Sequence, residues 1–304
     1  MATAAAAAPV LDSVLEAIGN TPLVRLHAPG LPARVELWGK CEWLNPGGSV
    51  KDRTALSLVT EGERSGALRP GKVIIDSSSG NTAVGLALVG RARGYEVELV
   101  MPSNVSAARR RLCTAYGARI IATDPLLGAD GAITEVRARV EGQPGRYFYA
   151  DQYRNPANPL AHYRGTGPEL WEQTEGRLTH FVAGLGTSGT VMGTGRFLRE
   201  QDPRVRVIAV QPDDALHGLE GLKHMPSSIV PSIYAAAGHD ELLLVKTEDG
   251  VAEAERVLRD HGLLVGHSAG AALCAARRVA AGLHAGVVVA LLPDGGERYL
   301  EAGG

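Results

Sequence analysis

The chain has 304 residues, of which 45% are hydrophobic and 21% are charged, and its formal net charge is −2. These values suit one large or two smaller globular domains with a substantial apolar core. A near-neutral charge without a basic stripe argues against nucleic acid as the main partner. No apolar run approaches the roughly 20 residues that a membrane span requires. We therefore expect a protein that acts on small molecules and binds neither nucleic acid nor membrane.

The chain contains three widely spaced cysteines: Cys41, Cys113 and Cys274. Their odd number and spacing fit neither a disulfide framework nor a metal site, so we expect reduced thiols, no metal and a cytoplasmic location. The alanine-rich stretch 1–8 lacks a charged n-region, which predicts a frayed tail and not a signal peptide.

Apolar periodicity predicts alternating strands and helices along the chain. A short helix is expected over 11–18, then a strand at 21–26 with 35–40 as its partner. Further strands are expected at 73–76, 97–101, 119–122, 147–150, 181–183, 205–211, 242–245 and 287–292. Further helices are expected at 82–93, 106–116, 131–140, 167–173, 190–200, 248–260 and 269–280. This pattern predicts two α/β domains with parallel sheets, covered on both faces, and a ligand cleft between them.

Two segments carry further signals. Residues 203–240 are rich in Pro, Gly, His and Ser, and they predict a flap over a site. The run Arg109-Arg110-Arg111 is the one basic cluster, and on a helix such a run predicts a solvated face.

The stretch 45–53 places a single lysine directly after a turn. Its proline fixes φ, its two glycines allow positive φ, and Ser49 can cap the helix that begins near Lys51. The unpaired N–H groups and the macrodipole disfavour a cation in the first turn of a helix, which lowers the cost of a neutral amine. A Schiff-base nucleophile needs a neutral amine, whereas a solvated lysine at a helix start is the alternative.

Two turns between a strand and a helix suit anions. The turn 77–82 brings hydroxyls and N–H groups together as a carboxylate requires, although an ordinary loop with a serine cap is equally consistent. The turn 184–190 matches the dinucleotide fingerprint G-x-G-x-x-G, with Asp213 or Asp214 as the ribose acid, so a nicotinamide-dependent oxidoreductase is the rival interpretation. The hydroxyls of Thr187 and Thr190 suit a terminal phosphate better than a pyrophosphate.

The stretch 266–270 matches the nucleophile elbow G-x-S-x-G of esterases. That enzyme class places an acid and then a histidine after the serine. Here His284 precedes Asp294 and no histidine follows it, so a hydrolase is disfavoured.

Taken together, the motifs P-G-G-S-V-K-D-R, S-S-G-N-T, G-T-S-G-T and G-H-S-A-G resemble one family. The segments I-G-N-T-P-L-V-R-L at 18–26 and D-Q-Y-R-N-P-A-N-P at 151–159 extend the match. The chain is similar to the fold type II pyridoxal-phosphate enzymes, the cysteine synthase and cystathionine β-synthase group. Residues 160–190, the segment 211–234 and the tail V-V-V-A-L-L-P-D-G-G-E-R-Y-L resemble cysteine synthase B in particular.

The resemblance implies two interleaved three-layer α/β domains with mostly parallel sheets, as in tryptophan synthase β. We expect residues 1–18 and 45–155 to form the smaller domain, and residues 19–44 and 156–304 to form the larger one. We also expect a homodimer that acts on small-molecule substrates.

The resemblance also implies roles for individual residues. Lys51 would bind pyridoxal phosphate through its amine and act as the catalytic base, Asn81 would touch the phenolic oxygen, and Ser268 would face the pyridine nitrogen. The cofactor phosphate would bind to Gly186, Thr187, Ser188, Gly189 and Thr190. The substrate carboxylate would bind to Ser78, Ser79, Gly80 and Thr82, with Gln152 closing the site. Ser78 replaces the family's usual threonine but keeps the hydroxyl.

The implied reaction is a β-replacement that forms cysteine from O-acetylserine and sulfide, or S-sulfocysteine from thiosulfate. O-phosphoserine remains open as the donor. Cystathionine β-synthase is the other alternative, but its members often carry extra domains for which these 304 residues leave no room. The family has a basic pair where this chain reads Gly221-Leu222-Lys223-His224. We expect Lys223 to lie near the cleft and assist thiosulfate, and His224 to face water.

Overall fold

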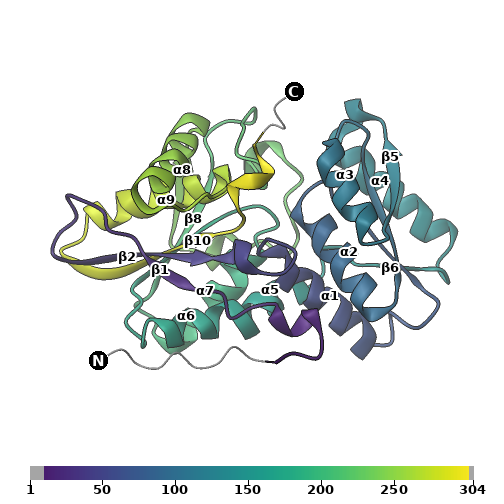
Figure 1. Cartoon of the computed structure of the whole chain (residues 1–304), viewed down its shortest axis with the longest axis horizontal. Helices are drawn as coiled ribbons and strands as arrows, with labels where there is room; N and C mark the ends of the chain where they lie inside the picture. The colour runs from purple at the N-terminus through teal and green to yellow at the C-terminus, as the bar shows by residue number, and fades with distance from the viewer. Residues whose placement is uncertain (1–9, 301–304) are drawn as a thin grey trace.

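The computed structural model describes residues 10–300, which fold around two β-sheets. The larger sheet has the strand order β1-β2-β10-β7-β8-β9 and the smaller one the order β5-β4-β3-β6. Figure 1 shows the larger sheet in the left half of the molecule and the smaller one in the right half. The alanine-rich tail expected at 1–8 lies outside the described residues.

The six-stranded sheet consists of β1 (Leu23–Arg25), β2 (Arg34–Cys41), β7 (His180–Gly184), β8 (Arg206–Pro212), β9 (Glu241–Val245) and β10 (Ala285–Leu292). Strands β1 and β2 pair, as expected, and run antiparallel, whereas the other pairs are parallel. Alternate residues of β7 face opposite layers, because Val182 belongs to the core on one face and Phe181 to the core on the other.

Helices cover both faces of this sheet, as its two apolar sides require. The helices of this half are α5 (Ala157–Ala161), α6 (Gly167–Gln173), α7 (Gly189–Gln201), α8 (Thr247–His261) and α9 (His267–Ala281). Leu273 of α9 packs in the same core as Val182, whereas Leu198 of α7 packs in the core of Phe181. The result is three layers.

The four-stranded sheet is entirely parallel and has the same layered plan. Its strands are β3 (Val73–Ser77), β4 (Glu96–Pro102), β5 (Arg119–Thr123) and β6 (Tyr147–Tyr149). Its helices are α1 (Lys51–Arg64), α2 (Asn81–Arg93), α3 (Ala107–Ala115) and α4 (Gly128–Gly142). Ile74 packs with Leu58 of α1 on one face, and Ile75 packs with Val136 of α4 on the other.

The fold class predicted from the sequence is therefore confirmed: the chain forms two three-layer α/β units with mostly parallel sheets. The chain also crosses between them, since β2 pairs with β10 before α1 enters the smaller unit. The helix expected at 11–18 is only a 3₁₀ turn over Val14–Ala17. The segment from α5 through a π-helical turn at His162–Thr166 was not predicted, because its prolines and glycines mask helical periodicity.

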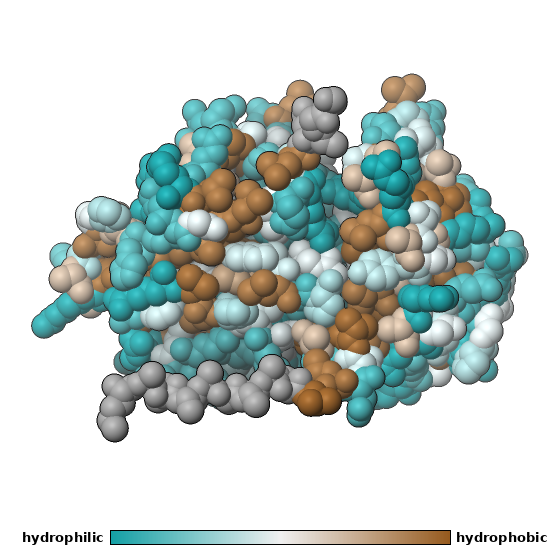
Figure 2. All heavy atoms as spheres, in the orientation of Figure 1, coloured by the Kyte–Doolittle hydropathy of each residue, from teal (hydrophilic) through white to brown (hydrophobic). Residues whose placement is uncertain are grey.

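Among residues 10–300, no helix combines the length and apolarity needed to cross a bilayer. Figure 2 shows apolar residues in separate patches among polar ones, and a surface that is hollowed between the upper parts of the two halves.

Candidate active site

One cavity of about 260 Å³ lies between the two sheets and is lined from both. Its walls include residues that follow the carboxyl ends of β3, β6, β7 and β10, the usual ligand position in parallel sheets. Most of the predicted site residues meet here: Lys51, Ser78, Ser79, Gly80, Asn81, Thr82, Gln152, Gly186, Thr187, Thr190, Lys223 and Ser268. Ser188 and Gly189 do not line it.

Lys51 is the first residue of α1 and is held there by the preceding turn. The Ser49 hydroxyl accepts the Lys51 N–H at 3.2 Å, although the N-cap position itself belongs to Val50. Gly48 has φ +79°, a left-handed conformation that glycine adopts without a steric penalty. The N–H of Gly47 donates to Asp52 Oδ2 at 2.5 Å, which ties the turn to the first turn of the helix.

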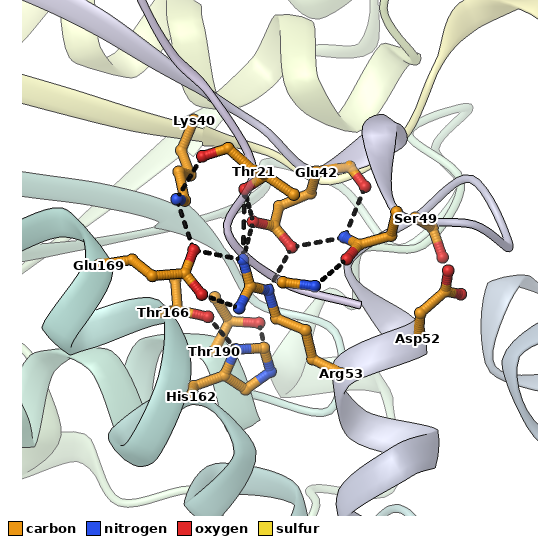
Figure 3. A network of polar contacts seen from close by, with 12 residues as sticks. Thr21, Lys40, Glu42, Ser49, Asp52, Arg53, His162, Thr166, Glu169 and Thr190 are labelled. Atoms are coloured by element: carbon orange, nitrogen blue, oxygen red, sulfur yellow. Dashed lines mark hydrogen bonds and ion pairs between the residues drawn. The ribbon is translucent and has the colours of Figure 1, made fainter. Parts of the chain in front are cut away.

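A buried network of charges fixes the start of α1 (Figure 3). Arg53 lies between two carboxylates: its Nε donates to Glu42 Oε2 at 2.7 Å and its Nη1 to Glu169 Oε1 at 2.6 Å. Lys40 donates to Glu169 Oε2 at 2.6 Å and to the Thr21 carbonyl at 2.7 Å. Because Arg53 stands two residues after Lys51, this network holds the backbone at Lys51 against β2 and α6.

Burial lowers the pKa of the Lys51 amine, while Asp294 and Glu42 partly oppose that shift. The side chain is nevertheless partly exposed where it faces the cavity. A lysine with a lowered pKa has a larger neutral fraction near neutral pH, and only the neutral amine can attack a carbonyl or accept a proton. The structure thus places a reactive amine in the cavity.

The N-terminus of α7 forms another wall of the cavity, with a turn whose groups suit an anion. Thr187 and Thr190 line the cavity there, and the first turn of α7 carries no acidic residue. Ser188 has φ +73°, and its hydroxyl bonds back to the Thr187 carbonyl. A side chain at Gly189 would collide with Asn158. Ser188 and Gly189 therefore shape the turn, while their neighbours face the cavity.

His162 supports this turn from below (Figure 3). Its Nε2 lies 3.3 Å from the Thr190 hydroxyl, and its Nδ1 lies 3.0 Å from that of Thr166. Burial lowers the pKa of His162 well below its usual value, and the charges of Lys51 and Arg53 add to the effect. The imidazole is neutral, so the turn offers hydroxyls and N–H dipoles to an anion. No local motif marks this histidine, because Thr190 and the charges of Lys51 and Arg53 lie on distant segments.

The loop between β3 and α2 forms the third wall. The Thr82 hydroxyl donates to Gln152 Oε1 at 2.7 Å, and Gln152 Nε2 donates to the Ser77 carbonyl at 3.2 Å. The Ser78 hydroxyl accepts the N–H of Gly80 at 3.3 Å. The N-cap residue of α2 is Gly80 and not a serine. The first turn of α2 also lacks an acidic residue, which leaves its N–H groups available to a carboxylate.

The segment 203–240, predicted as a flap, contains strand β8, so the irregular part that forms the flap is residues 213–240. Lys223 reaches the same cavity from this flap. Its N–H donates to the Leu185 carbonyl at 2.7 Å, and its amine lies 5.2 Å from the centre of the Tyr153 ring. Burial lowers the pKa of Lys223, with a small opposing effect of Asp130. His224 instead pairs with Ser227 at 2.8 Å and does not line the cavity.

Arg109 corrects the expectation of a solvated basic face. Its side chain is only 13% exposed, donates to the Ser79 carbonyl at 3.0 Å and pairs with Glu220 of the flap. It therefore connects the 77–82 loop to the flap. The role of Arg109 was not predicted, because nothing in the local sequence distinguishes it from the two arginines that follow.

The polar groups that line the cavity fit pyridoxal phosphate better than a dinucleotide. A reactive lysine, a hydroxyl-lined helix N-terminus and the hydroxyl of Ser268 share the cavity, which suits an aldehyde, a phosphate and a ring nitrogen. Asp213 and Asp214, the acids that a dinucleotide ribose would need, are exposed and do not line it.

Comparison with known proteins agrees with this geometry. Residues 14–294 match the family described as pyridoxal-phosphate dependent enzyme. The chain is 50% identical to a cysteine synthase of Aquifex aeolicus, with 95% of this chain and 90% of that protein covered. It is 41% identical to a cysteine synthase B of Salmonella typhimurium, with 96% of each covered.

The crystal structure of a cysteine synthase from Entamoeba histolytica superposes with a TM-score of 0.94 at 35% identity, covering 99% of this chain and 93% of that one. The nicotinamide interpretation of the 184–190 turn is thereby overturned. The chain belongs to the pyridoxal-phosphate-dependent enzymes and, within them, to the cysteine synthase family.

Proposed function

We propose that this protein forms L-cysteine and acetate from O-acetyl-L-serine and sulfide. The observation that carries the proposal is the meeting of the Lys51 amine, the α7 N-terminus and the 77–82 loop in one cavity. The relatives named cysteine synthase support the same reaction.

Each wall of the cavity has a part in holding the cofactor. Thr187, Thr190 and the N–H groups of α7 would bind its phosphate, and Lys51 would bind its aldehyde. Asn81 and Ser268 would contact its ring. When bound, pyridoxal phosphate supplies an electron sink that acidifies the Cα–H bond of an amino acid. Ser268 offers a neutral hydroxyl, which does not hold the ring nitrogen protonated as a carboxylate would, and this favours loss of a β-substituent over transamination.

The residues of the third wall bind the amino-acid substrate. The N–H groups at the start of α2 and the hydroxyls of Ser78, Ser79 and Thr82 would accept its carboxylate, and Gln152 would hold the loop closed. This places Cα within reach of Lys51. The neutral Lys51 amine takes the Cα proton as acetate leaves Cβ, and it returns that proton after sulfide has added to Cβ.

A substrate panel tests the proposal. The purified protein is supplied with O-acetylserine plus sulfide, O-phosphoserine plus sulfide, or serine plus homocysteine, and the amino-acid products are quantified by chromatography. We expect the highest kcat/KM for O-acetylserine with sulfide. Faster formation of cystathionine would instead assign a cystathionine β-synthase, and faster turnover of O-phosphoserine would change the donor.

We further propose that thiosulfate serves as a second sulfur donor and gives S-sulfocysteine. Lys223 supports this, because it places a positive charge at the cavity wall, 5.2 Å from the centre of the Tyr153 ring. Its amine is a point charge without the forked geometry of an arginine, so we expect weak discrimination between oxyanions. Comparing product formation from sulfide and thiosulfate under matched conditions tests this second activity.

The remaining proposals concern organisation. We propose domains of residues 1–18 with 45–155 and of residues 19–44 with 156–304, in agreement with the membership of β1 and β2 in the larger sheet. We propose a cytoplasmic homodimer, and three free cysteines suit a reducing compartment. Sedimentation equilibrium tests the dimer, because a mass of one chain would contradict it.

A further inference from the structure

The turn that follows β10 reaches across the cavity region to Asn81. Asn81 Nδ2 donates to Asp294 Oδ2 at 2.7 Å, and Arg298 Nη1 donates to Asn81 Oδ1 at 2.6 Å. The Tyr299 hydroxyl donates to the same Asp294 oxygen at 2.7 Å. These three residues belong to one short segment, 294–299, which we call the C-terminal turn.

The chemistry of these partners fixes the orientation of the Asn81 amide. A guanidinium can only donate hydrogen bonds, so the Asn81 amide oxygen must face Arg298 and the amide nitrogen then faces Asp294. A flipped amide would place N–H donors against N–H donors at Arg298. Burial raises the pKa of Asp294, while the hydrogen bonds from Tyr299 and Asn81 and the charges of Arg298 and Lys51 oppose that shift. Asn81 lines the cavity. With one N–H committed to Asp294, the second N–H is left to meet an acceptor oxygen.

The C-terminal turn also contacts two of the other elements that would hold the cofactor. Arg298 Nη2 donates to the Gly47 carbonyl in the turn that precedes Lys51. The ring of Tyr299 stacks on His267 at 5.1 Å between centroids, one residue before Ser268. Asp294 is 1% exposed, so its contact with Asn81 is shielded from water and carries more energy than a surface hydrogen bond.

We propose that Asp294 and Arg298 are positioning residues that present the Asn81 amide as a hydrogen-bond donor to the phenolic oxygen of the cofactor. The proposal rests on the proposed function, because it assumes that this cavity binds pyridoxal phosphate. Neither residue touches the reacting atoms: both act through Asn81, and Arg298 also holds the lysine turn.

Asp294→Asn tests the orientation with little change of shape, because an amide at 294 can pair with either end of Asn81. The measurements are the position of the visible absorption band of the holoenzyme and the rate at which the cofactor is lost on dilution. We expect a shifted band and cofactor loss that is faster by about ten-fold, since one charge-assisted contact is weakened. Asp240→Asn is the control, because the Asp240 carboxylate likewise accepts two hydrogen bonds, from Arg199 and from the Val207 N–H, but lies outside the cavity.

Arg298→Lys is the second variant, because a lysine keeps the charge but cannot reach both Gly47 and Asn81 with a planar fork. The same shift of the band and a similar gain in the rate of loss are expected. Arg278→Lys is its control, since Arg278 likewise donates to a side chain, Asp249, and to a backbone carbonyl, that of Leu244, but lies outside the cavity.

Variants that melt at a lower temperature but keep the wild-type band and rate of cofactor loss would overturn the proposal, because the turn would then be only structural. So would variants that match the wild type in every measurement. A wild-type protein without a visible band would instead contradict the proposed function itself, so the two failures are distinguishable.

Discussion

Two lysines face the same cavity from very different surroundings. Lys51 stands at the start of a 14-residue helix whose base is tied by the buried ions Arg53, Glu42 and Glu169. Lys223 stands on the flap, in an irregular segment whose neighbours Glu220 and Gly221 are exposed. Both amines have a pKa lowered by burial, so pKa alone does not separate their roles.

The difference lies in how firmly each amine is placed. A residue that forms a bond and moves a proton must keep its geometry within a fraction of an ångström, which a network of buried charges can enforce. A residue that selects among anions needs only to bring charge near the ligand. We infer that Lys51, held by the buried network, performs the chemistry and that the flap adjusts the choice of substrate. Each prediction below tests one side of this comparison.

The largest effect is expected from Lys51→Ala. Without this amine the chain loses both the cofactor's anchor and the base, so kcat should fall by about 10²–10⁴-fold or more. The visible band of the purified protein should shift or vanish as well. Lys246→Ala, at an exposed lysine, is the control and should leave both unchanged. Retention of wild-type kcat by Lys51→Ala would contradict the assignment.

The network beneath Lys51 should be costly to break. Burial raises the pKa of Glu169, but the hydrogen bonds and charges of Arg53 and Lys40 together outweigh it and lower the pKa to about 2, so the carboxylate is ionised at neutral pH. Glu169→Gln leaves Lys40 and Arg53 with one carboxylate, and it should reduce the free energy of unfolding by about 3–5 kcal/mol.

Urea titration of the holoenzyme measures this loss. Glu200→Gln removes a carboxylate from an exposed pair with Arg196 and should leave the midpoint unchanged. Equal midpoints for Glu169→Gln and the wild type would show that the network does not hold the start of α1.

On the flap side, Lys223→Ala should raise the KM for thiosulfate by about ten-fold or more, since a charge-assisted contact contributes roughly 1.5–3 kcal/mol. The KM for sulfide should barely move, because that small nucleophile needs no cationic partner. Steady-state kinetics with both donors measures the ratio. A similar loss for both donors would mean that Lys223 shapes the flap without reading charge.

The smallest expected effect concerns pH. Burial raises the pKa of Asp52 to about 7, whereas the same group titrates near ~3.9 in an unfolded chain. Between these values the folded state binds more protons, so rising pH lowers stability across this window and the loss is complete above the folded pKa. Asp52→Asn removes this proton and should lose less stability between pH ~4 and ~7.

Urea midpoints of the holoenzyme at several pH values test this prediction. Asp249→Asn, at an exposed ion pair, is the control and should follow the wild type. Identical slopes for Asp52→Asn and the wild type would show that the Asp52 carboxyl does not hold its proton in the folded state.

The sequence predicted local features well and long-range partners poorly. The strand–helix alternation follows from periodicity, and the glycine-rich turns around the cavity follow from turn chemistry at positions such as Gly48, which has positive φ as expected. The roles of Gln152, Lys223 and Ser268 came instead from the family resemblance. The partners of Arg53, Arg109 and Asn81 did not follow, because each bond joins segments far apart in the chain. An arginine at a helix surface and an arginine beneath a cavity have the same local sequence signature.

The lysine that binds the cofactor can be identified by chemical reduction of the holoenzyme. Borohydride makes the bond between a lysine amine and the cofactor's aldehyde permanent, so digestion and mass spectrometry of the reduced holoenzyme locate the modified lysine. The chain has five lysines, and two of them, Lys51 and Lys223, line the cavity. We expect to find the pyridoxyl group on Lys51 alone. Modification of Lys223, or of no lysine, would contradict it.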